Sequence, residues 1–286
     1  MKNKLSFAIF WLVVCIMLFL YSCGDEKRQA SSEEDSISMD LYVPTDSVED
    51  EVEQLVADAP MPKSAEGLFD DFFFNFASSS QLQVERTRFP LLVWRGERAD
   101  TIIKENWEYE RFFMRQGYYT LIFDDEKHAD VVKDTSIDKV MVETIYFGTE
   151  SVKQYAFDRK EGLWMLDNIR FVPIDDNRNA SFLRFYNQFA TDSLFQLESL
   201  SDVVEISVPD PDDDFAYLDG VVTPETWPAF APSNLPSGTI YNISYGERIV
   251  ESNSRIFVVR GISNGMEMQL DFALKNNHWL LTKYKE

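Results

Sequence analysis

Hydrophobic positions recur at helical spacing in two similar stretches of the chain, residues 69–85 and 182–198. At a constant offset of 113 residues, seven of the seventeen positions in these stretches are identical. The shared aromatic positions in the first stretch are Phe69, Phe72 and Phe76, which are spaced i, i+3 and i+7. This spacing places the three rings on one face of a helix. The pattern predicts two copies of one domain, each opening with an aromatic-faced helix.

Further matches continue the repeat beyond these two helices. Trp107 aligns with Trp227 at an offset of 120 residues, and Trp164 aligns with Trp279 at an offset of 115 residues. The change in offset means that the second copy gains and then loses a few residues. Each copy is of a usual size for a domain with its own core. The expected organisation is a first domain, a polar joint and a second domain, at residues 64–173, 174–180 and 181–286.

Within each copy the hydrophobic spacing changes from helical to alternating. The first copy is expected to continue with a strand at 91–94, a helix at 101–114, and strands at 118–123, 140–147, 152–157 and 163–172. The second copy is expected to continue with strands at 203–208, 239–245, 255–262, 266–274 and 278–284. Helices followed by an antiparallel sheet indicate the α+β class, with the helices packed on one face of the sheet.

The first 22 residues have the pattern of an export signal. Lys2 and Lys4 precede an uncharged apolar run of sixteen residues, which is short for a membrane-spanning helix. Leu20-Tyr21-Ser22-Cys23 resembles the lipobox, so cleavage before Cys23 and acylation of its thiol are expected. Cys15 is a poorer candidate because the residue before it is not small. An uncleaved anchor and an ordinary signal peptide are the alternatives.

Charge and cysteine content narrow the class of protein. The chain has 49 acidic and 27 basic residues and a formal net charge of −22, which disfavours nucleic acid as a partner. Residues 24–63 hold twelve acidic and three basic residues and little aromatic content. Residues 23–63 are therefore expected to be an acidic flexible tether, with a short amphipathic helix as an option at 45–56. After cleavage one cysteine remains, so no intrachain disulfide is expected.

The repeated motif F-x-x-F-[FY]-x-x-F-A-[ST]-x-S-x-x-Q-x-E, behind a lipobox, resembles an uncharacterised family of bacterial lipoproteins. The domains of that family look like the nuclear transport factor 2-like, or cystatin-like, fold. The resemblance covers residues 68–286 and implies two tandem domains, each with helices packed on a bent antiparallel sheet that forms a cone. It implies no activity, since such cones hold small molecules, catalytic residues or protein partners in different relatives.

Histidines give one candidate for catalysis. His128 follows Asp124 and Asp125, so an acid/base pair can be drawn. The same residues also fit a charged hairpin turn between two strands, which is the favoured interpretation. His278 corresponds to Leu163 in the first copy, which indicates a surface or rim position.

An acidic stretch near residue 210 gives one candidate for metal binding. Asp210, Asp212 and Asp214 have the alternate spacing that opens a calcium loop, but Phe215 and Val221 replace the Gly and Glu that such a loop requires. A solvated insertion loop is favoured, and weak calcium binding assisted by Asp219 is the alternative. No metal site and no cofactor are predicted.

Aromatic residues are the remaining candidates for a binding site. Core packing is the simpler explanation of tryptophans that match between the copies. If one cone is open, the first is expected to be, because Arg111 and Arg115 could pair with an anionic group there. The candidate pocket residues are Trp107, Arg111, Tyr119, Trp164, Trp227, Tyr241 and Trp279.

Together these patterns predict a lipid-anchored protein of the cell envelope. It is expected to be an outer membrane lipoprotein that faces the periplasm or the cell surface. Its expected role is to bind a small molecule or a protein without catalysis. The alternative is an enzyme that uses His128 with Asp124 or Asp125 in the first cone.

Overall fold

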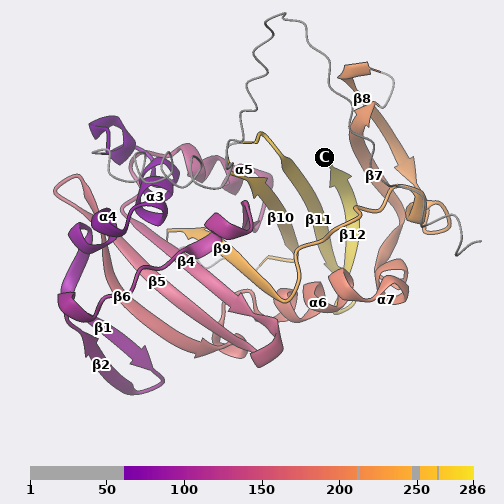
Figure 1. The fold of residues 1–286 in the computed structure, drawn as a ribbon. Coiled ribbons are helices and arrows are strands. Elements are labelled where there is room, and N and C mark those ends of the chain that lie inside the picture. The colour runs from indigo at the N-terminus through magenta and orange to yellow at the C-terminus, as the bar shows by residue number, and fades with distance from the viewer. Residues whose placement is uncertain (1–60, 211–212, 247–251, 263) are drawn as a thin grey trace, which may run out of the picture. The chain divides into compact units, whose positions relative to one another are not determined.

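Figure 1 shows the fold of the chain in a computed structural model. The structure describes residues 61–210, 213–246, 252–262 and 264–286. These belong to one compact unit, Asp46–Glu286.

Several expectations lie outside the described residues. They concern the signal peptide, the acylated Cys23, the helix at 45–56 and the tether as far as residue 60. Within the described part of the chain, no helix is both long and apolar enough to cross a membrane.

The helices of the two halves correspond to each other. Each aromatic-faced helix is interrupted once, at Ser79 in the first half and at Asp192 in the second, where the backbone is extended. The Ser79 hydroxyl accepts a hydrogen bond from the amide of Leu82, and Asp192 caps the second short helix in the same way. The helices are η1 (Lys63–Glu66), α3 (Phe69–Ser78), α4 (Ser80–Glu85), η2 (Lys104–Asn106), η3 (Phe112–Arg115), α5 (Glu126–Ala129), η4 (Asp130–Lys133), η5 (Phe147–Thr149), η6 (Ile174–Asp176), α6 (Ala180–Thr191), α7 (Ser193–Glu198) and η7 (Trp227–Ala229).

The strands confirm the alternating patterns of the sequence, and each predicted strand is present. The first half contributes β1 (Thr87–Arg95), β2 (Arg98–Ile102), β3 (Tyr118–Phe123), β4 (Lys139–Tyr146), β5 (Ser151–Lys160) and β6 (Leu163–Pro173). The second half contributes β7 (Leu200–Asp210), β8 (Asp213–Val222), β9 (Thr239–Tyr245), β10 (Ser254–Gly261), β11 (Glu267–Lys275) and β12 (His278–Lys285).

Two local predictions are wrong. Residues 101–114 do not form one helix. Gly96 has a positive φ of 61° and turns the chain back, so that residues 101 and 102 complete β2 beside β1, and the residues that follow contain the short helical turns η2 and η3. Ile103, which a helix at 101–114 would have packed inward, is 48% exposed. The acidic segment near residue 210 is not a solvated loop, since β8 pairs along β7 in an antiparallel hairpin.

All described strands join one sheet, in the order β2-β1-β6-β5-β4-β9-β3-β10-β11-β12-β7-β8. Strand β9 of the second half pairs antiparallel with β4 of the first half, and β3 of the first half pairs antiparallel with β10 of the second. Strands β3 and β9 lie side by side and parallel at the centre. The third strand of each half, β3 or β9, therefore pairs with a strand of the other half. The expected pair of tandem domains at 64–173 and 181–286 is not confirmed, because the halves share this sheet.

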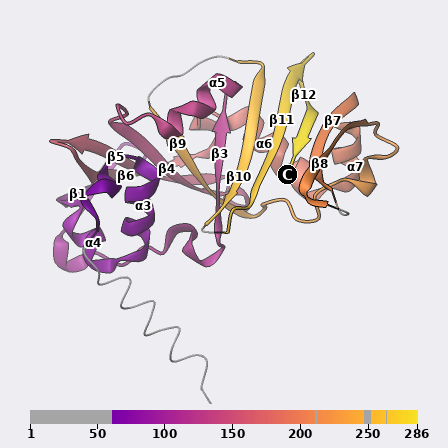
Figure 2. The ribbon, with the colours of Figure 1, turned by 90° about the horizontal axis from the view of Figure 1, so that it is seen from above.

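The exchanged strands contribute to two cores on opposite faces of the sheet. Along β3, Leu121 belongs to the core of the first half, and its neighbour Ile122 belongs to the core of the second. Along β10, Val258 belongs to the core of the first half, and its neighbour Phe257 belongs to the core of the second. Because successive strand residues point to opposite faces, helices α3 and α6 cover opposite faces of the sheet (Figure 2).

Ring contacts confirm that the repeat in the sequence is a repeat in space. Phe69 meets the edge of Trp164 at 5.0 Å and 78°, and the matching pair in the second half, Phe182 and Trp279, meets at 5.5 Å and 79°. Phe76 and Phe157 lie 5.2 Å apart at 90°, and their counterparts lie 5.2 Å apart at 89°. The two halves thus have the same aromatic core geometry.

The joint between the halves is polar, as expected, but much of it is buried. Asn177 is 5% exposed and donates a hydrogen bond of 2.7 Å to Glu143 on β4. Asn242 on β9 donates to the same carboxylate at 3.0 Å. Asn179 accepts a hydrogen bond from Arg255 on β10 at 3.1 Å. These contacts fix the joint to strands of both halves.

Strand exchange leads to a prediction about fragments cut in the exposed part of the joint, between Asp175 and Asp176. Residues 61–175 alone leave β4 without its partner β9, and residues 176–286 alone leave β10 without β3. We expect neither fragment to unfold cooperatively by circular dichroism, and we expect a mixture of the two to do so. Cooperative unfolding of either fragment alone would contradict this.

Candidate binding cleft

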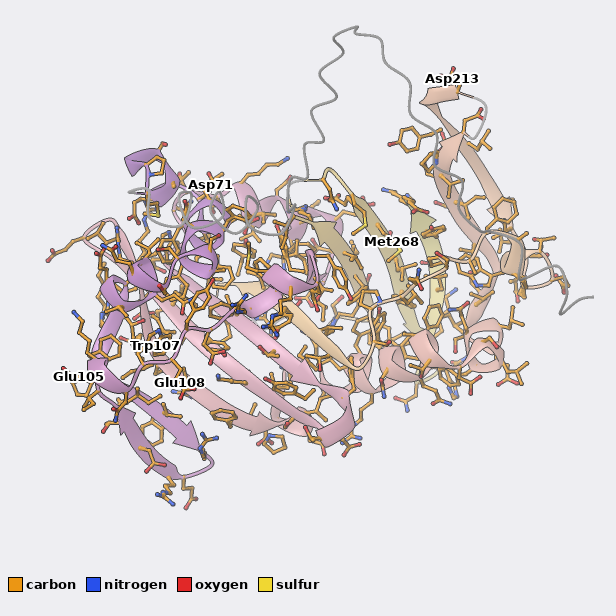
Figure 3. The ribbon with its side chains drawn as sticks, viewed as in Figure 1. Asp71, Glu105, Trp107, Glu108, Asp213 and Met268 are labelled. Atoms are coloured by element: carbon orange, nitrogen blue, oxygen red, sulfur yellow. The ribbon has the colours of Figure 1, made fainter. Side chains whose placement is uncertain are left out.

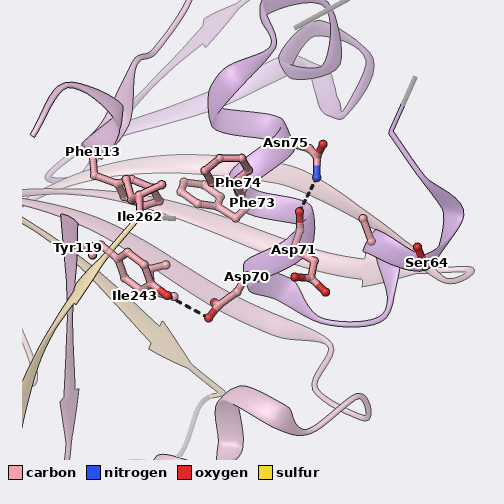
Figure 4. A pocket seen from close by; sticks show the side chains of 12 residues that line it. Ser64, Asp70, Asp71, Phe73, Phe74, Asn75, Phe113, Tyr119, Ile243 and Ile262 are labelled. Carbon is pink, nitrogen blue, oxygen red and sulfur yellow. Dashed lines mark hydrogen bonds between the residues drawn. The ribbon is translucent and has the colours of Figure 1, made fainter. Parts of the chain in front are cut away.

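A cleft of about 450 Å³ lies beside the first half of α3 (Figure 4). It is bounded by η1, α3, η3 and β3, and by residues of β9 and β10 that come from the second half of the chain. Its lining combines apolar side chains with several polar ones. The lining includes Ser64, Asp70, Asp71, Phe73, Phe74, Asn75, Phe113, Tyr119, Ile243 and Ile262.

Asp70, in the first turn of α3, is held by groups from both halves. Its carboxylate accepts a hydrogen bond from the Tyr119 hydroxyl at 3.2 Å and another from the Tyr245 hydroxyl. The Arg260 guanidinium lies 3.8 Å from the same carboxylate. Tyr119 is on β3, whereas Tyr245 and Arg260 are on β9 and β10, so the site exists only because the strands are exchanged.

Burial governs the protonation of this cluster. It raises the pKa of Asp70 above the ordinary value of 3.8, although hydrogen bonds from Tyr245 and the charge of Arg260 oppose this. Burial, and then the nearby Asp70 charge, also raise the pKa of Tyr119 and of Tyr245. Both tyrosines therefore remain hydrogen-bond donors to Asp70 at neutral pH.

Two exposed side chains complete the mouth of the cleft. Asp71 is exposed, and no described side chain forms a hydrogen bond or ion pair with its carboxylate. Phe74 is 37% exposed, whereas the other phenylalanines of α3 are buried. The cleft can therefore hold an apolar group against Phe74 while carboxylate oxygens accept hydrogen bonds from a polar end.

The second half does not have this arrangement. At the same offset of 113 residues, Asp70, Asp71 and Phe74 correspond to Leu183, Arg184 and Asn187. Leu183 is fully buried in the second core, and Arg184 is paired with Asp175 at 2.6 Å. The Tyr186 hydroxyl donates to the backbone carbonyl of Pro236, so the segment before β9 packs on α6.

The structure separates the candidate pocket residues predicted from the sequence. Of these seven, Tyr119 is the one that lines the cleft. Trp164, Trp227 and Trp279 are buried in the two cores. Tyr241 is partly buried against the first core, and the Arg111 guanidinium lies over the ring of Tyr109.

Trp107 and Trp227 do not have equivalent environments. Trp227 is 1% exposed, and its indole N–H donates to Gln196 at 2.9 Å. Trp107, labelled in Figure 3, is partly exposed. It lines a separate pocket with Val84 and Tyr109. Core packing thus explains three of the four candidate tryptophans.

His128 does not lie in the cleft. It belongs to a helical turn, α5, rather than to a hairpin turn, and Asp125 caps this turn by accepting a hydrogen bond from the His128 amide at 2.8 Å. The imidazole is 3.9 Å from Asp124, which is too long for a hydrogen bond, and Asp124 is instead paired with Arg255 at 3.1 Å. The geometry therefore does not support an acid/base pair. His278 is exposed at the start of β12, as a rim position requires.

The calcium hypothesis has no structural support among the described residues. Asp212 lies outside them, and in the described part of the chain no group of three or more acidic, histidine or cysteine side chains could hold a metal ion. Asp219 pairs with Ser207, whereas Asp213 pairs with Asp210. Six residues of strand separate the two positions, which corresponds to roughly 20 Å, so Asp219 cannot assist a site at the tip.

Sequence reasoning missed Asp70, Asp71, Phe74, Tyr245 and Arg260. The available indication was the difference between the two aligned helices. Asp70 is one helical turn before Phe73 and two turns before Ala77, on an inward face, and its counterpart is a leucine. A carboxylate at a core-facing position in one copy alone indicates that this position has a role other than core packing.

Comparisons with known proteins agree with the architecture of helices on a curled, mostly antiparallel sheet, in which β1 and β6, β7 and β12, and β3 and β9 pair in parallel. A crystal structure of an NTF2-like protein from Bacteroides fragilis superposes with a TM-score of 0.70 and 40% sequence identity, over 79% of this chain and 98% of that one. The fold is therefore NTF2-like. The family described as a domain of unknown function (DUF4348) matches residues 48–286, and the chain belongs to this family. No curated protein matches the chain.

The raised pKa of Asp70 predicts how stability depends on pH. Its folded-state pKa exceeds 3.8, so its contribution to stability is full below that pH and is lost as the pH rises through the folded-state pKa. We expect the free energy of unfolding of the wild type, relative to Asp70→Asn, to fall across this window in urea titrations. A difference that stays constant or rises with pH would contradict the assignment.

Proposed function

We propose that this protein is a lipid-anchored protein of the cell envelope whose cleft beside α3 binds a small molecule without catalysis. The proposed ligand has an apolar body and a cationic or hydroxyl-bearing end. The observation that carries the proposal is that the exposed Asp71 carboxylate and the exposed ring of Phe74 both line a cleft whose α3 side has no equivalent on α6 of the second half.

Charge favours a ligand that donates hydrogen bonds. Asp70 and Asp71 both line the cleft, and Arg260 is the cation near Asp70, so the carboxylates are only partly offset. The chain as a whole carries a net charge of −22, which raises the local concentration of cations and lowers that of anions. This replaces the anionic ligand considered for Arg111 and Arg115, which do not line the cleft.

The fold is compatible with such a role without specifying it. The family is described as a domain of unknown function, so function has to be argued from the site. A concave site with apolar walls and a few polar groups is the usual form of a small-molecule site. The volume of about 450 Å³ falls within the range typical of such sites.

The anchor in this proposal is an acylated Cys23. The support is the sequence: a basic start, an apolar run of sixteen residues and the residues Leu20-Tyr21-Ser22 before the cysteine. More than one acyl chain gives stable anchoring, which the diacylated, N-acylated cysteine of lipoproteins provides. The proposed location is the outer membrane, with the folded part in the periplasm or at the cell surface, tethered through residues 23–63.

The cleft can be tested with a matched pair of probes, 2-phenylethylamine and phenylacetate. We expect the amine to bind more tightly by isothermal titration calorimetry, because the carboxylates attract it and Phe74 contacts its ring. Asp71→Asn should weaken amine binding by about tenfold, which corresponds to about 1.4 kcal/mol. Asp100→Asn, which changes a half-exposed aspartate on β2, should leave it unchanged.

A second pair of variants tests the apolar wall. Phe74→Ser should weaken binding of the amine, whereas Leu92→Ser, at a side chain of similar exposure on β1, should not. Equal binding of the amine and the carboxylate, or equal effects of the two serine variants, would overturn the proposed site.

The anchor can be tested by metabolic labelling with a palmitate analogue in a bacterial host. Cys23→Ser should abolish both the label and the partition of the protein with membranes, because the acylated thiol is removed. Cys15→Ser is the matched control and should retain both. Loss of the label in Cys15→Ser alone would place the anchor at the other cysteine.

A further inference from the structure

The sheet ends in two edge strands that differ in length and protection. At one end β2 has five residues and carries Arg98 and Asp100. At the other end β8 has ten residues, and its residues Asp213–Val222 include no lysine, arginine or proline. Short length, charge and proline are the usual means of preventing an edge from pairing with another chain. The β2 edge is protected by its short length and its charges, whereas β8 is long and contains no proline.

Exposed apolar side chains line one face of this hairpin. Tyr217 is 61% exposed and Val221 is 66% exposed, and they lie two pleats apart on the same face of β8. Val203 on β7 is 49% exposed. It lies on the same face, because Glu205, two residues further along β7, is directly opposite Val221. Asp219 lies between Tyr217 and Val221, so the face alternates apolar and acidic groups.

The charge of this end is uniformly negative in sequence. Residues 200–225 contain eight aspartates and glutamates and no lysine or arginine. The β1–β2 hairpin, residues 87–102, contains three arginines and two acidic residues. Lys283 on β12 is 3.6 Å from Glu205 and offsets one of the eight charges. The β8 end therefore favours a cationic partner.

We propose that the outer edge of β8 binds an extended segment of a partner protein. On the face of that segment next to Tyr217, Asp219 and Val221, lysine or arginine alternates with β-branched or aromatic residues, so that each kind recurs at every fourth position. The backbone of that segment would pair with the free edge of β8, its apolar side chains would cover Tyr217 and Val221, and its cations would meet Asp219 and the other carboxylates. A second copy of this chain is disfavoured, because it would bring the same acidic hairpin against this one.

This surface is independent of the cleft. Asp71 lies on α3 beside the cleft, whereas Asp213 lies at the tip of the β7–β8 hairpin (Figure 3). In the sheet order, β10, β11, β12 and β7 lie between β3, which lines the cleft through Tyr119, and the edge strand β8. Loss of one activity therefore need not affect the other.

The test uses the protein from residue 24 to the C-terminus and a labelled peptide about nine residues long to match β8. Its odd positions alternate valine and lysine, and its even positions are threonine, so that one face presents both valine and lysine. Fluorescence anisotropy measures binding, and hydrogen exchange followed by mass spectrometry measures amide protection. We expect binding that protects amides within Asp213–Val222. The same peptide with glutamate in place of each lysine should not bind.

Two variants of β8 and one matched control sharpen the test. Asp219→Lys should weaken binding of the lysine peptide by about tenfold, because it replaces an attraction by a repulsion. Val221→Thr preserves strand propensity and should weaken binding by removing apolar contact. Asp100→Lys makes the same charge change on the β2 edge and should have no effect.

Three results would overturn the proposal. Binding without protection of β8 amides would show electrostatic adsorption rather than strand addition. Equal binding of the two peptides would show that charge plays no part. Protection of β8 that rises with protein concentration in the absence of peptide would show that a second copy occupies the edge.

Discussion

The pairing of β4 with β9 and of β3 with β10 is the constraint on which the rest of the structure depends. Each pairing joins a strand of one half to a strand of the other, so neither hydrophobic core can be completed locally. Ile243 and Val258 come from the second half of the sequence and belong to the core of the first. The stability of either core is therefore a property of the whole chain from residue 61 onward.

The same exchange allows one half to differ chemically while its scaffold is preserved. Leu183 packs in the second core, and a carboxyl group at the equivalent position of the first half would be costly to bury alone. Asp70 is tolerated there because Tyr119, Tyr245 and Arg260 surround it. Two of these three groups, Tyr245 on β9 and Arg260 on β10, belong to the second half. The duplicated core supplies rigidity, and the strand exchange supplies the polar partners of the cleft.

Local patterns in the sequence predicted local structure well and long-range structure poorly. The strands at β3 and β9 have the predicted bounds, because alternation is a property of the segment alone. The exchange was not predictable from alternation, since β3 presents apolar residues on both faces and would suit either neighbour. The cleft was missed for a related reason. Asp70 is an ordinary first-turn residue in the sequence, and its partners are 49 to 190 residues away.

The buried polar cluster at the joint explains why the exchanged pairing is specific. Glu143 is 3% exposed and accepts hydrogen bonds from Asn177, Gln154 and Asn242. Without exchange, β4 would not have β9 beside it, and Glu143 would lose Asn242 while remaining buried. An underpaired buried carboxylate is costly, whereas apolar neighbours such as Ile145 would pack in either arrangement. The apolar residues thus make a core possible, and the carboxylate with its amide donors selects which strands complete it.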